Sequence, residues 1–308
     1  MPKISCSNWG YRQWTLADVI SSIAGIGYGA IEIVTHGLGW PIGYHLNPDF
    51  DRSYIERLNE TLQAHKVKVA CISPSNDFCR PRAGSKEREV EHINRNIDLA
   101  VKVGAPVIRI QATGLRDIPE GVSRSSFIET IVNALGKCVD YGKSQGVKLA
   151  IETHGGVWAL VPENMRDLLD AVRSDYLGIC LHTHIDYTVE TVSTLGGKVL
   201  HVHLSETSRV AQRSYYIYAL RRRGRSDSDI MKELGITGEE FEEASSWEPR
   251  EIYLGEGEVD FERIFTGLKD AGYSGWWNFE GHSTVNPEED ARRAYSYIEG
   301  LLRKIATP

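Results

Sequence analysis

The sequence has no long hydrophobic run and few cysteines, and both absences narrow its class. No stretch of about 18 consecutive apolar residues is present, and the start, Met-Pro-Lys-Ile-Ser-Cys, lacks the apolar core of a signal peptide. The five cysteines show no CxxC or other metal-like spacing, which is typical of reduced thiols. These observations predict a cytoplasmic protein with no membrane partner.

An excess of positive charge is also missing. The net formal charge is −7 over 308 residues, which argues against a nucleic-acid backbone as the main partner. The one strongly basic run, Arg221-Arg-Arg-Gly-Arg225, is local. It is either a solvated helix end or loop, or a contact with an anionic group or a partner subunit. No Ser/Gly/Lys phosphate cradle is present either, so nothing indicates phosphate recognition.

Short β-branched runs alternate with amphipathic stretches, which is the pattern of consecutive βα units. The stretches 51–65, 85–103 and 125–145 carry apolar residues at helical spacing, and a helix at 287–304 closes the chain. Several stretches are followed at once by Gly, as a left-handed C-cap requires. The pattern predicts an α/β fold, a (β/α)8 TIM barrel. The eight predicted strands are 4–8, 30–34, 67–73, 107–111, 148–153, 177–182, 199–204 and 275–280.

One interval is longer than the others. About seventy residues separate the seventh and eighth predicted strands, so Arg209 to about Tyr253 is an insertion, with helices expected near 211–222 and 228–234. It leaves from the carboxyl end of strand seven, where long ordered loops act as lids or binding elements. An outer decoration or an oligomer contact is the alternative. No low-complexity linker divides the chain, so we expect one domain, residues 1–308.

Four predicted strands end in a residue that can bind a metal: Glu152, His182, His203 and Glu280. The carboxyl ends of neighbouring barrel strands converge on one point, where active sites are built. Two Glu and two His suit a single divalent ion, with Mn²⁺ favoured and Co²⁺, Mg²⁺ or Zn²⁺ as alternatives. Each residue alone is equally well read as a cap or an ion-pair partner. Their common position at strand ends favours a metal centre.

Further candidates surround this predicted centre. His154 lies two residues beyond Glu152 and faces the same way, so it contacts substrate or supports the ligands. Glu32 and Asn8 follow strands two and one as rim contacts, and Trp158 is either a wall under a sugar ring or a core residue. Arg109 and Gln111 either reach the pocket or satisfy the barrel interior.

Several motifs in the second half resemble those of the xylose isomerase-like barrel proteins, often called sugar phosphate isomerases/epimerases. The segment His201-Val-His203-Leu-Ser-Glu206-Thr-Ser-Arg209 is similar to the ketose 3-epimerase segment that carries a metal His and, six residues on, a substrate-binding Arg. Glu206 would then hold Arg209 or a substrate hydroxyl. The run from Leu254 to Phe265 resembles the family's ending. The resemblance implies a metal set at Glu152, position 182, His203 and Glu280.

Position 182 departs from the family pattern. Relatives commonly have Asp there, often with His three residues later, whereas this chain reads Leu181-His182-Thr-His184-Ile185-Asp186. His182 replaces the Asp as ligand and His184 stands in for the missing His, or the register slips and His184 or Asp186 coordinates instead. Strand alternation favours His182. Replacing Asp by neutral His removes one negative charge from the shell, which makes the metal a stronger Lewis acid.

The ligand set implies enediolate chemistry. A divalent ion on adjacent oxygens of a hydroxy-ketone acidifies the C–H between them, and Glu152 and Glu280 are the natural acid/base pair. We expect an isomerase or epimerase of a small sugar or keto-sugar. The alternatives are a dehydratase or lyase on a keto-polyol or keto-glycoside, as in the inosose dehydratase and C-glycoside deglycosidase branches, or a sugar-binding subunit that has lost catalysis. Barrels of this type commonly pair, so we expect a homo-oligomer, with a second subunit as a further option.

Overall fold

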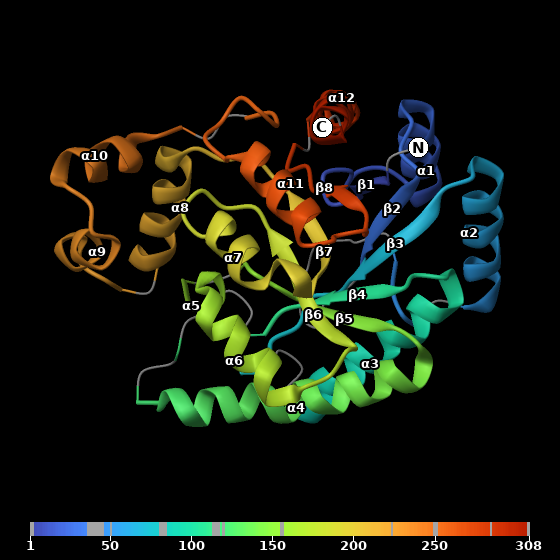
Figure 1. The fold of residues 1–308 in the computed structure, drawn as a ribbon, viewed down its shortest axis with the longest axis horizontal. Coiled ribbons are helices and arrows are strands. Elements are labelled where there is room, and N and C mark those ends of the chain that lie inside the picture. The colour runs from blue at the N-terminus through green and yellow to red at the C-terminus, as the bar shows by residue number, and fades with distance from the viewer. Residues whose placement is uncertain are drawn as a thin grey trace.

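The computed structural model describes residues 3–35, 46–49, 51–79, 85–112, 118, 121–154, 157–222, 224–248, 252–283 and 285–306. Within them eight parallel strands form a closed barrel in chain order, with helices around it (Figure 1). The predicted TIM barrel is confirmed. The strands are β1 (Ile4–Ser7), β2 (Ala30–Val34), β3 (Lys68–Ser73), β4 (Val107–Ile110), β5 (Lys148–Glu152), β6 (Leu177–His182), β7 (Val199–Leu204) and β8 (Trp277–Phe279).

The strands are buried on both faces, which explains their nearly continuous apolar sequences. Their register aligns the carboxyl ends: His182 lies opposite His203 between β6 and β7, and Glu152 lies opposite Cys180 between β5 and β6. Glu280 follows β8 directly, and its backbone N–H donates to the carbonyl of Leu204. The side chains that follow these strands therefore share one end of the barrel.

Helix boundaries follow local capping chemistry. Asp51 and Ser85 accept hydrogen bonds from the backbone of the first helical turn, and Gly104 and Gly146 end their helices in the left-handed conformation. The helices are α1 (Leu16–Ile26), α2 (Arg52–His65), α3 (Lys86–Val103), α4 (Arg124–Gln145), α5 (Val157–Leu160), α6 (Pro162–Val172), α7 (Thr188–Leu195), α8 (Arg209–Arg221), α9 (Asp227–Leu234), α10 (Gly238–Ser246), α11 (Phe261–Asp270) and α12 (Pro287–Ala306), with a 3₁₀ turn at Gly196–Lys198.

Three helices between β7 and β8 lie beside the barrel, on the left of Figure 1: α8, α9 and α10. Their apolar side chains pack mainly on one another and form a small core of their own, made of Ile217, Leu220, Ile230, Phe241 and Ala244. Helix α11 then takes the usual barrel position before β8. The prediction from sequence contained α8 and α9 but not α10. That this inserted segment, 209–253, acts as a lid stays a prediction.

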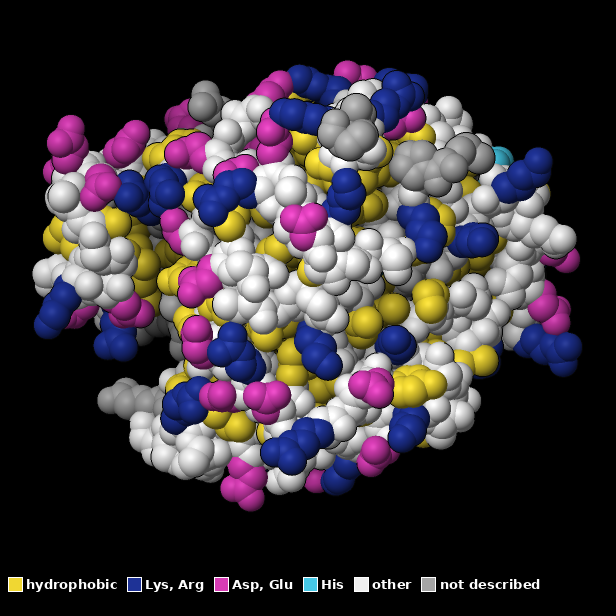
Figure 2. Space-filling model, viewed as in Figure 1, with side chains coloured by type: hydrophobic (Ala, Val, Ile, Leu, Met, Phe, Trp, Pro, Cys, Tyr) yellow, Lys and Arg dark blue, Asp and Glu magenta, His cyan; other side chains and the backbone are white. Residues whose placement is uncertain are grey.

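The surface carries mixed charge. Figure 2 shows acidic and basic side chains interspersed over one face of the molecule. Among the helices of the described residues, none combines the length and the apolar character that crossing a membrane requires.

Candidate metal centre

Four side chains from four separate strand ends meet at the carboxyl end of the barrel. Glu152 ends β5, His182 ends β6, His203 lies in β7 and Glu280 follows β8. One ligand atom from each lies within 4.8 Å of all the others, and all four side chains are buried. The structure thus brings together the four residues that the sequence singles out as metal ligands.

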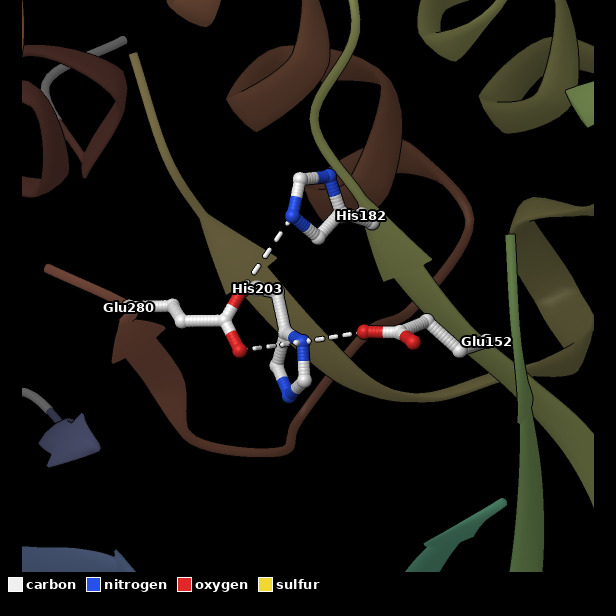
Figure 3. A group of neighbouring side chains, drawn as sticks. All are labelled: Glu152, His182, His203 and Glu280. Carbon is white, nitrogen blue, oxygen red and sulfur yellow. Dashed lines mark hydrogen bonds and ion pairs between the residues drawn. The ribbon is translucent and has the colours of Figure 1, made fainter. Parts of the chain in front are cut away.

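Figure 3 shows how the group is arranged around His203. Glu152 and Glu280 approach the ring from opposite sides: Nδ1 of His203 lies 2.7 Å from Oε1 of Glu152 and 3.3 Å from Oε1 of Glu280. Nε2 of His182 lies 3.1 Å from Oε2 of Glu280. The two carboxylates therefore flank the position that a ligand of His203 Nδ1 would occupy.

The charges of the group call for a cation. Burial opposes the ionised form of Glu280, yet His203 and His182 hold the pKa of this carboxyl well below its ordinary value. Burial alone would lower the pKa of His203, but Cys180 and the carboxylates of Glu280 and Glu32 raise it well above its ordinary value. In this structure the imidazolium proton supplies positive charge between buried carboxylates. A divalent ion on Nδ1 would supply the same charge, so the residues fit a metal.

Glu32 holds the far side of this group, and the sequence interpretation of its position was wrong. We expected Glu32 at the pocket rim, whereas it lies fully buried within β2. Its Oε2 is 2.7 Å from Nε2 of His203 and 2.9 Å from Nε2 of His201. A carboxylate that takes the other ring N–H of a ligating His fixes the tautomer of that His. A lone Glu inside the apolar run Ala30–Val34 was the available signal.

Glu152 is held by side chains from β4. Nε of Arg109 lies 3.6 Å from its Oε1, and Nε2 of Gln111 donates to its Oε2 at 3.4 Å. Burial opposes the ionised form, but Arg109 and His203 hold the pKa of Glu152 far below its ordinary value. Arg109 also donates to the carbonyl of Pro74. Of the two roles left open for this pair, the contact with Glu152 supports the one at the pocket.

The structure places His182 in the group and the two other candidates outside it. Nε2 of His184 lies 3.2 Å from the hydroxyl of Tyr216 in α8, and Asp186 accepts an ion pair from Arg209. The rings of His154 and His182 stack with centroids 4.4 Å apart. Burial and the neighbouring His182 lower the pKa of His154 to about 3, so this ring is neutral at pH 7.

Two candidate substrate-binding residues have protein partners. NH1 of Arg209 lies 2.6 Å from Oδ1 of Asp186, and its backbone N–H donates to Glu258. Glu206 accepts hydrogen bonds from the backbone of Thr207, Gly255 and Val259. Glu206 thus braces the turn before α11, while Arg209 pairs with acidic side chains. Their roles toward a substrate stay predictions.

Asn8 and Trp158 both have clear structural contacts. Oδ1 of the buried Asn8 accepts the backbone N–H of Val34 and so ties β1 to β2 at the barrel end. Trp158 is buried in α5 and packs edge-on against Phe127 of α4, with ring centroids 5.3 Å apart. Of the two readings of Trp158, this contact supports the core role. The predicted substrate contacts of both residues stay predictions.

A cavity of about 350 Å³ opens beside the group. Glu206 and the residues after β7 line one side, and Glu280 and His282 after β8 line another. The third side includes Trp247 and Tyr253, from the chain between α10 and α11. Glu280 is thus both a member of the four-residue group and part of the cavity wall. The sequence gave no pattern that would single out Trp247 or Tyr253.

The comparison with family models decides the family. A model described as xylose isomerase-like TIM barrel matches residues 20–301. The chain belongs to this family. Another relative of this xylose isomerase-like barrel is the uncharacterized protein MJ1311 of Methanocaldococcus jannaschii. It is 20% identical over 318 residues, which cover 99% of this chain and 92% of that protein.

Solved structures share the fold of this xylose isomerase-like barrel at low sequence identity. An L-ribulose 3-epimerase structure is similar with a TM-score of 0.72 at 18% identity, covering 99% of this chain and 96% of that one. The IOLI protein, solved with a zinc atom, also has a TM-score of 0.72, at 15% identity over 99% of this chain and all of that one.

Proposed function

We propose that this protein is a divalent-metal-dependent isomerase or epimerase of a small sugar or keto-sugar, with Glu152, His182, His203 and Glu280 as metal ligands. The single observation that carries the proposal is the placement of two ionised carboxylates on opposite sides of His203 Nδ1. The family match and the fold shared with an L-ribulose 3-epimerase support it. Mn²⁺ is the favoured ion, and Co²⁺, Mg²⁺ and Zn²⁺ suit the same N/O donor set.

The bound ion would polarise adjacent oxygens of the substrate and acidify the C–H between them. Glu152, held ionised by Arg109, removes that proton from one face. Glu280 carries a proton to the opposite face, which inverts the carbon. Return of the proton to the neighbouring carbon gives the isomer instead. The burial of both carboxylates keeps bulk water from competing for the proton.

The test is solvent-proton exchange. Metal-loaded protein is incubated in D₂O with a panel of free ketopentoses and ketohexoses, and the sugars are followed by NMR. We expect deuterium at the carbon beside the carbonyl, together with an epimer or an aldose. Replacing Glu152 or Glu280 by Gln should lower exchange at least about 100-fold, the usual contribution of a general acid or base.

Glu89→Gln is the matched control, because Glu89 is an equally buried carboxylate in α3, away from the group. Loss of water or of a substituent from the substrate would move the assignment to a lyase, which shares the first proton abstraction. Full exchange in both Gln variants would reject the acid/base pair, and no exchange in any ketose would reject the isomerase.

A further inference from the structure

The cavity beside Glu280 has a wall of apolar side chains that the proton-transfer chemistry does not use. Trp247, Ile252 and Tyr253 come from the chain between α10 and α11, and Phe279 and Val285 flank Glu280 on the other side. Val285 is 90% exposed, more than any other large apolar residue that the structure describes as exposed. A contiguous apolar surface at a pocket marks a place where an apolar group binds.

The wall is held in position before any ligand arrives. The guanidinium of Arg293 lies over the ring of Tyr253, 3.7 Å from its centroid, and Arg293 forms an ion pair with Glu256. One face of the Tyr253 ring is therefore covered by a cation from α12. A preformed wall of this kind reduces the conformational entropy that binding would otherwise cost.

The nearby polar acceptor is already committed. Glu206 lines the same cavity, but its two carboxylate oxygens accept the backbone N–H groups of Thr207, Gly255 and Val259. A hydroxylated chain lying against Trp247 and Ile252 would exchange hydrogen bonds with water for apolar contacts, which is unfavourable. An aromatic or other apolar ring would gain from the same contacts.

The position of the cavity says which part of a substrate reaches it. Of the four proposed ligands, Glu280 is the one among the described lining residues of the cavity. The reacting carbons must lie between Glu152 and Glu280, so the cavity receives the part of the substrate that extends past Glu280. That part meets the apolar wall.

We infer that the substrate is a carbohydrate that carries an apolar ring substituent, and that the cavity walled by Trp247, Ile252, Tyr253 and Val285 binds this ring. The inference rests on the proposed function for the position of the sugar. The contact between ring and wall does not itself require the metal. Trp247 and Ile252 are then specificity-determining residues that take no part in proton transfer.

The test compares two glycosides with the same sugar. Metal-loaded protein is titrated by calorimetry with 4-nitrophenyl β-D-glucopyranoside and with methyl β-D-glucopyranoside. We expect the aryl compound to bind about tenfold more tightly, as one aromatic contact allows. Trp247→Ala should remove this preference and leave the methyl glycoside unaffected. Ile252→Ala is a second variant that should reduce it. Tyr218→Ala, at an exposed aromatic residue of α8 outside the cavity lining, should keep it.

Equal affinities, no measurable binding of the aryl glycoside, or a preference that survives Trp247→Ala would overturn the inference. The D₂O experiment separates this failure from that of the proposed function. An aryl preference without exchange in any ketose would leave the ring site standing and reject the isomerase. Exchange without an aryl preference would do the reverse.

Discussion

Oε2 of Glu32 lies 2.7 Å from Nε2 of His203, so a fully buried carboxylate on β2 holds the imidazole on β7 from across the barrel. The same oxygen is 2.9 Å from Nε2 of His201. With Nε2–H of His203 donated to Glu32, the lone pair of Nδ1 faces Glu152 and Glu280. The orientation of the proposed metal ligand is therefore set from behind, by a residue outside the ligand group.

We predict that Glu32→Gln weakens metal binding about 10- to 100-fold, the usual effect of losing the carboxylate behind a ligating His. The amide can still fill the space, but it accepts a weaker hydrogen bond and can present an N–H to the ring. The dissociation constant for Mn²⁺ or Zn²⁺, measured by competition with a chelator, checks this. Glu89→Gln again serves as control. Equal affinity in wild type and Glu32→Gln would show that Glu32 does not orient His203.

The second ligand can be identified by metal content. We expect His182→Ala to lose the metal and His184→Ala to keep it, because Nε2 of His182 points at Glu280 whereas His184 contacts Tyr216. Elemental mass spectrometry on protein purified without a His-tag measures both. Retention in His182→Ala together with loss in His184→Ala would mean that the ligand register is shifted from the one seen in Figure 3.

Arg209 should affect substrate binding more than turnover. Its side chain is half-exposed and paired with Asp186, so we expect Arg209→Lys to raise KM about tenfold with kcat little changed, as loss of one charge-assisted hydrogen bond predicts. Arg213→Lys is the matched control on the same helix, because Arg213 pairs with Glu240 inside the inserted segment. The same KM in both variants would remove Arg209 from the substrate site.

His92 should make the protein sensitive to acid. Burial in α3 lowers its pKa to about 4, against an ordinary 6.5. Between these values the unfolded chain binds a proton that the folded chain does not, so stability falls as pH drops from about 6.5 to 4 and this loss then levels off.

The variant that tests this is His92→Gln, which cannot be protonated. Relative to wild type it should gain up to about 3 kcal/mol of unfolding free energy between pH 7 and pH 4.5, by the free energy of a pKa shift of this size. Urea unfolding at the two pH values measures the gain. His65→Gln, at an exposed residue of α2, should show no such gain. A parallel loss of stability in wild type and His92→Gln would contradict the assignment.

The barrel could be predicted from sequence because its determinants are local. Buried parallel strands have apolar sequences, and glycines such as Gly104 and Gly146 end helices where a left-handed residue is required. The residues that follow these strands meet at one end whatever the details of packing. Glu152, His203 and Glu280 could therefore be grouped without a structure.

What the sequence could not give was height within the barrel. Alternation predicts that a strand residue faces inward, but the stagger between strands decides which inward residues share a layer. For this reason Glu32 was expected at the rim, although it lies beneath His203. Helix α10 was missed for another reason: its Thr237 and Glu240 form a capping box, yet few apolar residues mark the helix.

The small core of the inserted segment separates two properties that evolve at different rates. Ile217, Ile230 and Phe241 pack within α8, α9 and α10, while the barrel core lies elsewhere. Recombination that exchanged this segment would change the wall contributed by Trp247 and leave the strand ends that carry Glu152 and His203 intact. The fold can thus acquire new substrates by replacing one part, while the machinery for moving a proton is inherited unchanged.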